Sequence, residues 1–99
     1  MTKAKKTNET INFNNEVVIG GTVKRVLVQN DKVTKFILDN TQTTPKGNVS
    51  HAFISVCVFE ECDLKTGDTV EVKGRLTTSS YKDNFRVDII ADIDDVNLI

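Results

Sequence analysis

The sequence predicts an all-β domain, and three observations support this prediction. Val, Thr and Ile supply 33 of the 99 residues, whereas Leu and Ala together supply eight. Side chains that branch at Cβ suit a pleated sheet better than a helix. Segments of alternating apolar and polar residues recur along the chain and are separated by Gly, Pro, Asn and Asp. The length allows one small domain with a single core.

The overall composition is that of an ordinary globular domain, with 38% apolar and 27% charged residues. No apolar run approaches the ~20 residues of a membrane-spanning helix. The basic start, MTKAKKTNET, has no apolar core behind it and is not expected to be a secretory signal. We therefore expect a cytoplasmic protein that does not contact a membrane.

The two cysteines, Cys57 and Cys62, are too few for a disulfide framework, and we expect both to be reduced thiols. The alternative is a metal site that they would form with His51. Spacings of six and five residues match no zinc signature. We therefore expect neither a metal nor another cofactor.

The charge is unevenly distributed along the chain. The net charge of −1 argues weakly against a polyanionic ligand, but residues 1–15 carry +2, residues 16–87 carry +1 and residues 88–99 carry −4. Residues 1–14 are polar and lack periodicity, which predicts a flexible basic arm. Residues 15–99 are interpreted as the folded domain.

Two strands are predicted in the first half of the chain. The first covers residues 16–29, and Gly20-Gly21 indicates a bulge or bend that lets one long strand serve two sides of a barrel. A two-residue turn is predicted at Asn30-Asp31. The second strand covers residues 32–40, and Phe36 is assigned to the core because Leu38 shares its face.

The third strand, residues 49–59, follows a polar loop over residues 40–48 and has two different faces. One face is wholly apolar and is assigned to the core: Ala52, Ile54, Val56 and Val58. The other face mixes aromatic rings with small polar groups, as expected of a surface that meets something flat: His51, Phe53, Ser55, Cys57 and Phe59.

The last two strands form a predicted hairpin. Residues 60–65 leave room for one short helical turn at most, and a turn over residues 65–68 precedes the fourth strand, residues 69–78. A hairpin loop over residues 79–84 bears Tyr81. The fifth strand begins at Phe85, which is assigned to the core. The side chains expected to point inward from the fourth strand are Val70, Val72, Gly74 and Leu76.

The pattern is typical of a five-stranded OB-fold barrel: five strands in ~85 residues, a long bent first strand and a short connector before the fourth. The same pattern also fits other small β-barrels, such as the SH3-like ones. Local sequence narrows the choice. Residues 64–76, LKTGDTVEVKGRL, resemble the L-K-x-G-D-x-V-x-V-x-G-R-L segment of bacterial and phage single-stranded DNA-binding proteins. Phe53, Phe59 and Tyr81 fall where that family has aromatic residues. The residues 36–38 and 21–23 also resemble its second and first strands.

The resemblance implies sequence-tolerant binding of single-stranded DNA, which the protein would protect in replication, recombination or plasmid and phage DNA metabolism. Phe53, Phe59 and Tyr81 are the candidates for base stacking, at ~1–3 kcal/mol per base. The candidates for phosphate and polar contacts are Lys24, Arg25, Lys35, Lys46, Ser55, Lys73, Arg75, Thr77, Lys82 and Arg86.

The resemblance also implies assembly and partners. Family members associate as homodimers or homotetramers, often through the first strand, and Val17–Val23 is an apolar edge candidate. Replication proteins are further expected partners. The family usually continues into a tail with an acidic-hydrophobic tip, whereas this sequence ends in line with the last strand. In this it is similar to the primosomal replication proteins, which are dimeric OB-fold relatives.

Three other classes of function are weighed against DNA binding. An enzyme is disfavoured because the sequence has one histidine, no evident pair of catalytic carboxylates and no GxSxG, HExxH or P-loop motif. An OB-fold protein-interaction module would use the Phe53 and Phe59 face as a protein interface. An RNA-binding module would use the same rings, because stacking does not distinguish the sugar.

Overall fold

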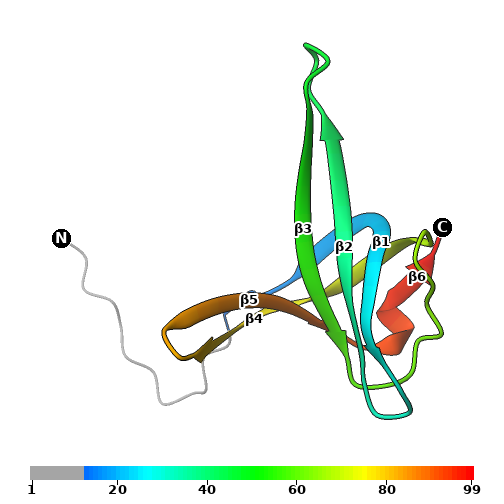
Figure 1. Cartoon of the computed structure of the whole chain (residues 1–99), viewed down its shortest axis with the longest axis vertical. Helices are drawn as coiled ribbons and strands as arrows, with labels where there is room; N and C mark the ends of the chain where they lie inside the picture. Colours follow the sequence, from blue (N-terminus) through cyan, green and yellow to red (C-terminus); the bar gives the residue numbers. More distant parts are fainter. Residues whose placement is uncertain (1–12) are drawn as a thin grey trace.

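Five long strands close a barrel around one apolar core (Figure 1). The computed structural model describes residues 13–99, apart from the side chain of Tyr81. The strands are β1 (Val17–Gln29), β2 (Thr34–Thr43), β3 (Val49–Val58), β4 (Thr69–Tyr81) and β5 (Asn84–Ala91). Their order is β1-β2-β3-β5-β4, with β1 and β4 paired to close the ring. This confirms the predicted all-β OB-fold. Most of the predicted arm, residues 1–14, lies outside the described residues.

The first strand serves two sides of the barrel, as predicted. Residues 17–22 of β1 pair with β4, and residues 22–29 pair with β2. The register with β2 shifts between Val23 and Arg25 and again between Val26 and Val28. The bulges therefore follow the glycine pair. Of the bulge or bend predicted at Gly20-Gly21, the bulge is wrong, but the strand passes from β4 to β2 directly after Gly21.

Two glycines allow close approaches that the closed barrel requires. A Cβ on Gly21 would collide with the backbone of Asp39, where β1 passes from β4 to β2. A Cβ on Gly74 would likewise collide with the backbone of Ile90, where β4 passes from β1 to β5. Both positions therefore need a residue without a side chain.

The core lies between the inward faces of the five strands. Period-2 alternation sends every second side chain of each strand inward, as the sequence pattern predicted. Phe36 and Leu38 are wholly buried, which confirms the assignment of Phe36 to the core. The other side chains of the core cluster are Val23, Val56, Val58, Leu64, Val70, Val72, Ile89 and Ala91.

The β2–β3 hairpin extends beyond the barrel as a two-stranded ribbon (Figure 1). β2 and β3 stay paired as far as Thr43 and Val49, whereas β1 pairs with β2 only from Thr22 and Asp39 onward. The connecting loop covers residues 44–48, so the predicted loop over residues 40–48 is too long. Ala52, which was assigned to the core, is exposed because the ribbon has no second layer over it.

The β4–β5 hairpin forms a second extension. The two strands stay paired as far as Tyr81 and Asn84, so the predicted loop over residues 79–84 is wrong. Lys82 and Asp83 have φ values of 48° and 67°, which is the left-handed pair of a tight two-residue turn. The turn matches the right-handed twist of the strands and lets the ladder continue to the tip.

The β4–β5 extension explains why Phe85 is not a core residue. Phe85 is 71% exposed, and Leu76 and Val87 are 47% and 49% exposed. The sequence placed all three on the face that points inward within the barrel. β3 pairs with β5 only from Ser55 and Asp88 onward, so this layer does not reach Phe85 and Val87. β1 pairs with β4 only as far as Gly74, so Leu76 lies beyond β1. The assignments of Phe85 and Leu76 to the core are therefore wrong.

The turns at the base of the barrel are held by side chains. The β1–β2 turn covers four residues, rather than the two predicted, because the Asn30 side-chain oxygen accepts the backbone N–H groups of Lys32 and Val33 at 2.8 and 3.0 Å. The Thr34 hydroxyl donates to the Glu60 carbonyl at 2.7 Å and accepts from the Cys62 N–H at 3.0 Å. The connector before β4 is thereby fixed without a helical turn, within the predicted limit of at most one.

The chain ends with a short return to β4. A 3-10 turn (η1, Ile93–Asp95) leads into β6 (Val96–Leu98), which pairs with β4 at residues 70–72. Residues 90–99 were predicted either to continue the fifth strand or to bend away: Ile90 and Ala91 continue β5, and the chain bends away after them. Among residues 13–99, no helix is long and apolar enough to cross a membrane.

Candidate nucleic-acid interface

The outward side chains of β1, β2 and β3 form the surface that holds most of the predicted contacts; we call it the outer face. It comprises the outward-pointing residues within the ranges 22–28, 35–41 and 51–57. Strand register aligns its side chains in rows that continue onto β5 and β4. One row runs Arg25, Ile37, Ser55, Asp88 and Thr77, and the next runs Val28, Lys35, Cys57, Ile90 and Arg75.

Phe53 is the central ring of the outer face. It lies opposite Asp39 of β2 and is 58% exposed. The Lys24 Nζ atom lies 5.8 Å from the centroid of the Phe53 ring, within the range of a cation–π contact. Lys24 is the unpaired residue of the first β1 bulge, which explains how a side chain from a non-adjacent strand reaches the ring.

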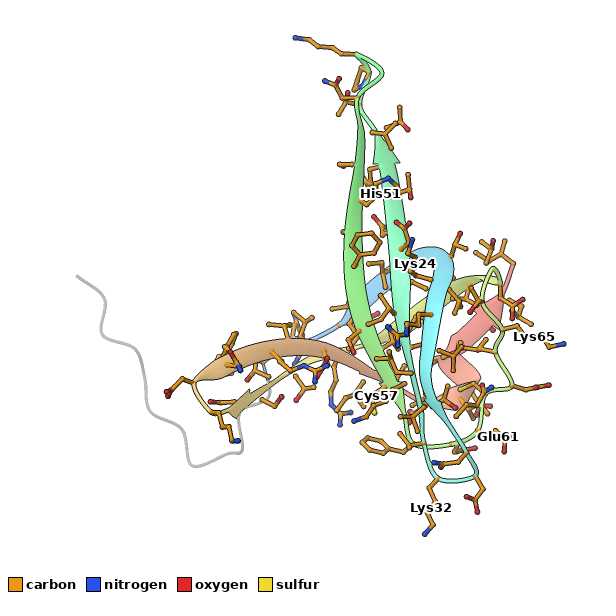
Figure 2. All side chains as sticks on the ribbon, in the orientation of Figure 1. Lys24, Lys32, His51, Cys57, Glu61 and Lys65 are labelled. Carbon is orange, nitrogen blue, oxygen red and sulfur yellow. The ribbon has the colours of Figure 1, made fainter. Side chains whose placement is uncertain are left out.

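His51 extends the ring surface along β3. Its imidazole is parallel to the Phe53 ring within 3°, with the ring centroids 6.0 Å apart. Figure 2 shows His51 farther out along the β2–β3 ribbon than Lys24, with Cys57 toward the opposite end of β3. Alternation places residues 51 and 53 on one face, so the sequence pattern already indicated that His51 lies beside Phe53. His51 was nevertheless not among the predicted contacts.

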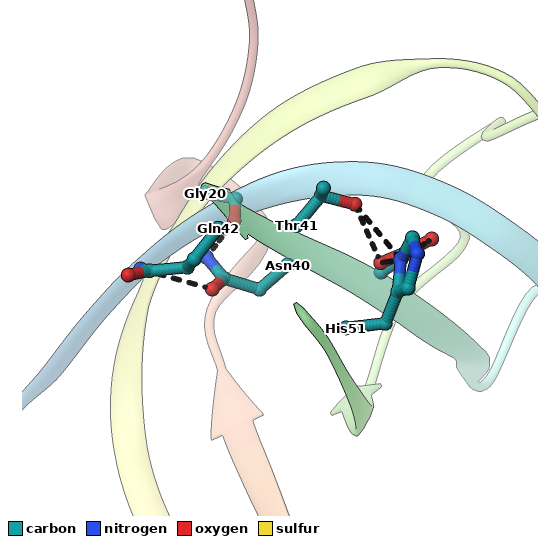
Figure 3. A network of polar contacts seen from close by, with 6 residues as sticks. Gly20, Asn40, Thr41, Gln42 and His51 are labelled. Carbon is teal, nitrogen blue, oxygen red and sulfur yellow. Dashed lines mark hydrogen bonds and ion pairs between the residues drawn. The ribbon is translucent and has the colours of Figure 1, made fainter. Parts of the chain in front are cut away.

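Asp39 and Thr41 hold the His51 ring in place (Figure 3). The His51 Nδ1 atom lies 3.1 and 3.3 Å from the two Asp39 carboxylate oxygens and 3.1 Å from the Thr41 hydroxyl. The Thr41 hydroxyl donates to Asp39 Oδ1 at 3.0 Å. The hydrogen bond from His51 holds the pKa of the Asp39 carboxyl below its usual value despite partial burial, and Thr41 and the charge on Lys24 add to this lowering.

Phe59 lies at the other end of β3. It follows the last strand residue, Val58, and is 64% exposed, so the alternative of a core role does not hold. Phe59 is six positions along the extended chain from Phe53, or about 20 Å at ~3.3 Å per position. The two rings are thus separate exposed surfaces rather than one cluster.

Two of the predicted basic contacts lie at hairpin tips. Lys46 is in the loop between β2 and β3, and Lys82 is in the turn between β4 and β5. Tyr81 is the last residue of β4, and its main chain pairs with Asn84. Its side chain lies outside the described part of the structure, so its role as a stacking residue stays a prediction.

Lys73 is set apart from the outer face. Its ammonium lies 3.3 Å from the Glu16 carboxylate. The two residues line a surface hollow together with Arg75, Asp92 and Asp95. Its acidic neighbours make Lys73 a poor phosphate contact, and the structure does not bring it together with Phe53.

Asp88 introduces an acidic group into the first row of the outer face. Its carboxylate lies between Ser55 of β3 and Thr77 of β4 in the register. The Oδ1 atom is buried without a hydrogen bond and lies 3.7 Å from an Arg86 guanidinium nitrogen. Arg86 is therefore partly occupied in neutralising Asp88.

The two cysteines are free, with Cys57 buried and Cys62 half-buried. Burial raises the pKa of both thiols, so both are neutral at physiological pH. Among residues 13–99, no three His, Cys, Asp or Glu side chains gather to hold a metal ion. The groups that the outer face offers to a ligand are rings, cations and hydroxyls.

No protein-family model matches the sequence, and no curated protein sequence is detectably similar to it. Solved structures share its fold at low identity. The Plasmodium falciparum SSB in complex with ssDNA superposes with a TM-score of 0.70 at 19% identity, over 92% of this chain and 97% of that one. The S. cerevisiae mitochondrial single-stranded DNA-binding protein Rim1 gives 0.66 at 15% identity, over 86% and 94%. The dimeric N-terminal domain of PriB from Thermoanaerobacter tencongensis gives 0.53 at 18%, over 88% and 98%.

Proposed function

We propose that this protein binds single-stranded DNA with little base preference, through the outer face of its barrel. The observation that carries the proposal is the pairing of the exposed Phe53 ring with the Lys24 ammonium. A ring accepts any base by stacking, and an adjacent cation accepts the phosphate of the same nucleotide. The likeness in fold to an SSB that was solved in complex with ssDNA supports this proposal.

The proposed contacts divide into three groups by position. Lys24, Arg25, Lys35, Phe53 and Ser55 form the centre, on neighbouring strands of the outer face. Arg75, Thr77 and Arg86 extend the centre across β4 and β5. The outlying contacts are Phe59, Lys46, Tyr81 and Lys82, with Lys73 the weakest of the whole set.

The proposed biological role is to protect exposed single strands in replication, recombination or plasmid and phage DNA metabolism, within the cytoplasm. A chain that binds without base preference suits this role, because its DNA targets share a backbone but not a sequence. The protein supplies no chemistry in this account. Its effect comes from occupying the strand and hiding it from pairing.

We further propose a homodimer or homotetramer. Two surfaces support it. The Leu76, Phe85 and Val87 side chains leave an exposed apolar patch on the β4–β5 extension. Val17–Gly21 of β1 pairs with β4 on one edge, while in the described residues no strand pairs with its other edge.

Light scattering tests the assembly and identifies its surface. The parent should have a mass of at least twice 11.0 kDa. If the apolar patch is the interface, Phe85→Lys should reduce the mass to that of the monomer. If the β1 edge is the interface, Val18→Lys should reduce the mass instead. A monomeric parent at tens of micromolar would contradict the proposed assembly.

Titration with three nucleic acids of equal length tests the proposed binding. Oligo-dT should bind well and duplex DNA poorly, because a duplex hides the base faces on which the rings stack. Tighter binding to oligo-rU than to oligo-dT would favour the RNA-binding alternative. Equal affinity for single strand and duplex would refute stacking, and no binding to any of the three would favour a protein-interaction module.

A further inference from the structure

Base stacking on Phe53 does not require the hydrogen-bond network of His51, Asp39 and Thr41. Thr41 and His51 belong to the ribbon that extends beyond the barrel, where there is no second layer and no core to stabilise, and Asp39 lies at the base of that ribbon, opposite Thr22 of β1. His51 is half-exposed, whereas the Asp39 side chain is 18% exposed. The carboxylate is thus fixed beneath an accessible ring, which is the arrangement of a positioned surface group.

The hydrogen bonds determine which imidazole nitrogen faces outward. The lowered pKa of Asp39 keeps its carboxyl ionised at neutral pH, so it can only accept hydrogen bonds. The Thr41 hydroxyl already donates to this carboxylate, and the His51 Nδ1 atom must therefore carry the proton that it shares with Asp39. Nε2 is left without a partner in the network, as an acceptor in the neutral ring and a donor in the protonated ring.

The position of His51 connects this nitrogen to the proposed interface. Its ring lies parallel to the Phe53 ring within 3°, with the centroids 6.0 Å apart, so a strand that stacks on Phe53 comes within reach of His51. The charged groups that face this pair are Asp39 from β2 and Lys24 from β1, the latter across the Phe53 ring. From β5, the nearest charged group in the register is Asp88, opposite Ser55.

We propose that His51 is a nucleic-acid contact that binds in two ways: its ring adds a second stacking surface beside Phe53, and its protonated Nε2 donates to a phosphate oxygen. Asp39 acts through His51 as the positioning residue, because its hydrogen bond to Nδ1 orients the ring and leaves Nε2 facing outward. The proposal rests on the proposed function. Its consequence is that single-stranded DNA binds more tightly as the pH falls from about 8 to about 6.

The chain suits a direct test because His51 is its one histidine. We would measure oligo-dT affinity by anisotropy at about pH 6 and about pH 8, with a dye whose emission is constant over that range. The parent should bind about three- to tenfold more tightly at the lower pH, the effect of one added cation at a phosphate. Subtracting the response of the His51 variants removes the contribution of the N-terminal amine.

Four variants separate the two roles of His51. His51→Phe should keep most of the affinity at pH 8 but lose the gain at pH 6, since it retains a ring without a charge. His51→Ala should lose the gain and also weaken binding at pH 8 by about fivefold or more, because a stacking ring is gone. Asp39→Asn should reduce the ratio of the two affinities. Gln42→Ala, on the opposite face of the same ribbon, should match the parent.

The outcomes distinguish this proposal from the proposed function. If His51→Ala binds as the parent does at both pH values, while Phe53→Ala binds weakly, the His51 contact is wrong and the single-strand interface stands. If His51→Phe keeps the full gain at pH 6, protonation of His51 is not its source and the proposal is overturned. If the parent does not bind oligo-dT at all, the proposed function itself fails.

Discussion

The Lys24 ammonium lies 5.8 Å from the centre of the Phe53 ring, although β1 and β3 are not neighbours in the barrel. The β1 bulge that frees Lys24 from the ladder makes this contact possible. A cation and a ring from different strands then converge on one exposed surface. One ring and one cation are the minimum set of groups that can bind one nucleotide, since a nucleotide presents one base and one phosphate.

Phe36 and Phe59 should differ sharply when each is replaced by alanine. Phe36 is wholly buried, so Phe36→Ala should reduce the free energy of unfolding by ~3–5 kcal/mol. Phe59 is 64% exposed, so Phe59→Ala should change it by no more than ~0.5 kcal/mol. Urea denaturation measures both. Phe59→Ala should instead weaken oligo-dT binding by ~1–3 kcal/mol, and unaltered binding would remove Phe59 from the interface.

Lys24 and Lys73 provide a matched pair for the electrostatic part of the account. Lys24→Gln should lower the slope of log K against log salt by about 0.7 for each phosphate contact that is lost. Lys73→Gln should lower the slope much less than Lys24→Gln, because Lys73 is engaged with Glu16 beside other acidic groups. Affinities at four or more salt concentrations give both slopes. Equal losses in the two variants would show that general charge, rather than the outer face, attracts the strand.

The fold was largely predictable because barrel strands alternate strictly. The inward sets of β2 and of the barrel part of β3 were assigned correctly, since each combines apolar residues at period two. Phe85 was assigned to the core by the same alternation, but it is exposed. Alternation identifies which face a side chain is on, but the presence of a second layer over that face depends on where β3 stops pairing with β5. That is a tertiary property, which no local pattern encodes.

The candidate site was predictable in its residue types but not in its arrangement. Phe53, Ser55 and Lys35 share neighbouring outward positions, as alternation predicts. The contact of Lys24 with Phe53 depends on a bulge, and the pairing of Lys73 with Glu16 depends on how the chain enters β1. The His51–Asp39 pair depends on the β2–β3 register, which was not predicted because the hairpin loop was assigned too long.

The Asp39 carboxyl predicts a specific response to acid. Its pKa in the folded protein is lowered from the usual 3.8, chiefly by the hydrogen bond from His51, so the folded state releases this proton more readily than the unfolded state. The resulting stabilisation is present above the unfolded pKa and is lost as the pH falls through the folded one. The thermal midpoint of the parent should therefore fall more steeply below about pH 4 than that of Asp39→Asn. Parallel curves would contradict the hydrogen bond.

Cys57 predicts the opposite behaviour at alkaline pH. Burial raises the pKa of this thiol above its usual 9.0, with Asp88 adding to the rise and Lys35 opposing it. The unfolded chain ionises first, so stability is retained below that usual value and is lost as the pH rises through the folded pKa. Stability above about pH 9 should therefore decline more in the parent than in Cys57→Ala. Equal declines would show that Cys57 is not shielded from water.

The most direct test of the outer face compares Phe53→Ala with Leu98→Ala. Leu98 is 66% exposed, against 58% for Phe53, and lies on β6, which pairs with β4 and not with β2 or β3. Both variants should fold as the parent does. Phe53→Ala should weaken oligo-dT binding by ~1–3 kcal/mol and Leu98→Ala should leave it unchanged. If Phe53→Ala, still folded, binds oligo-dT with the parent's affinity, the outer face is not the nucleic-acid interface.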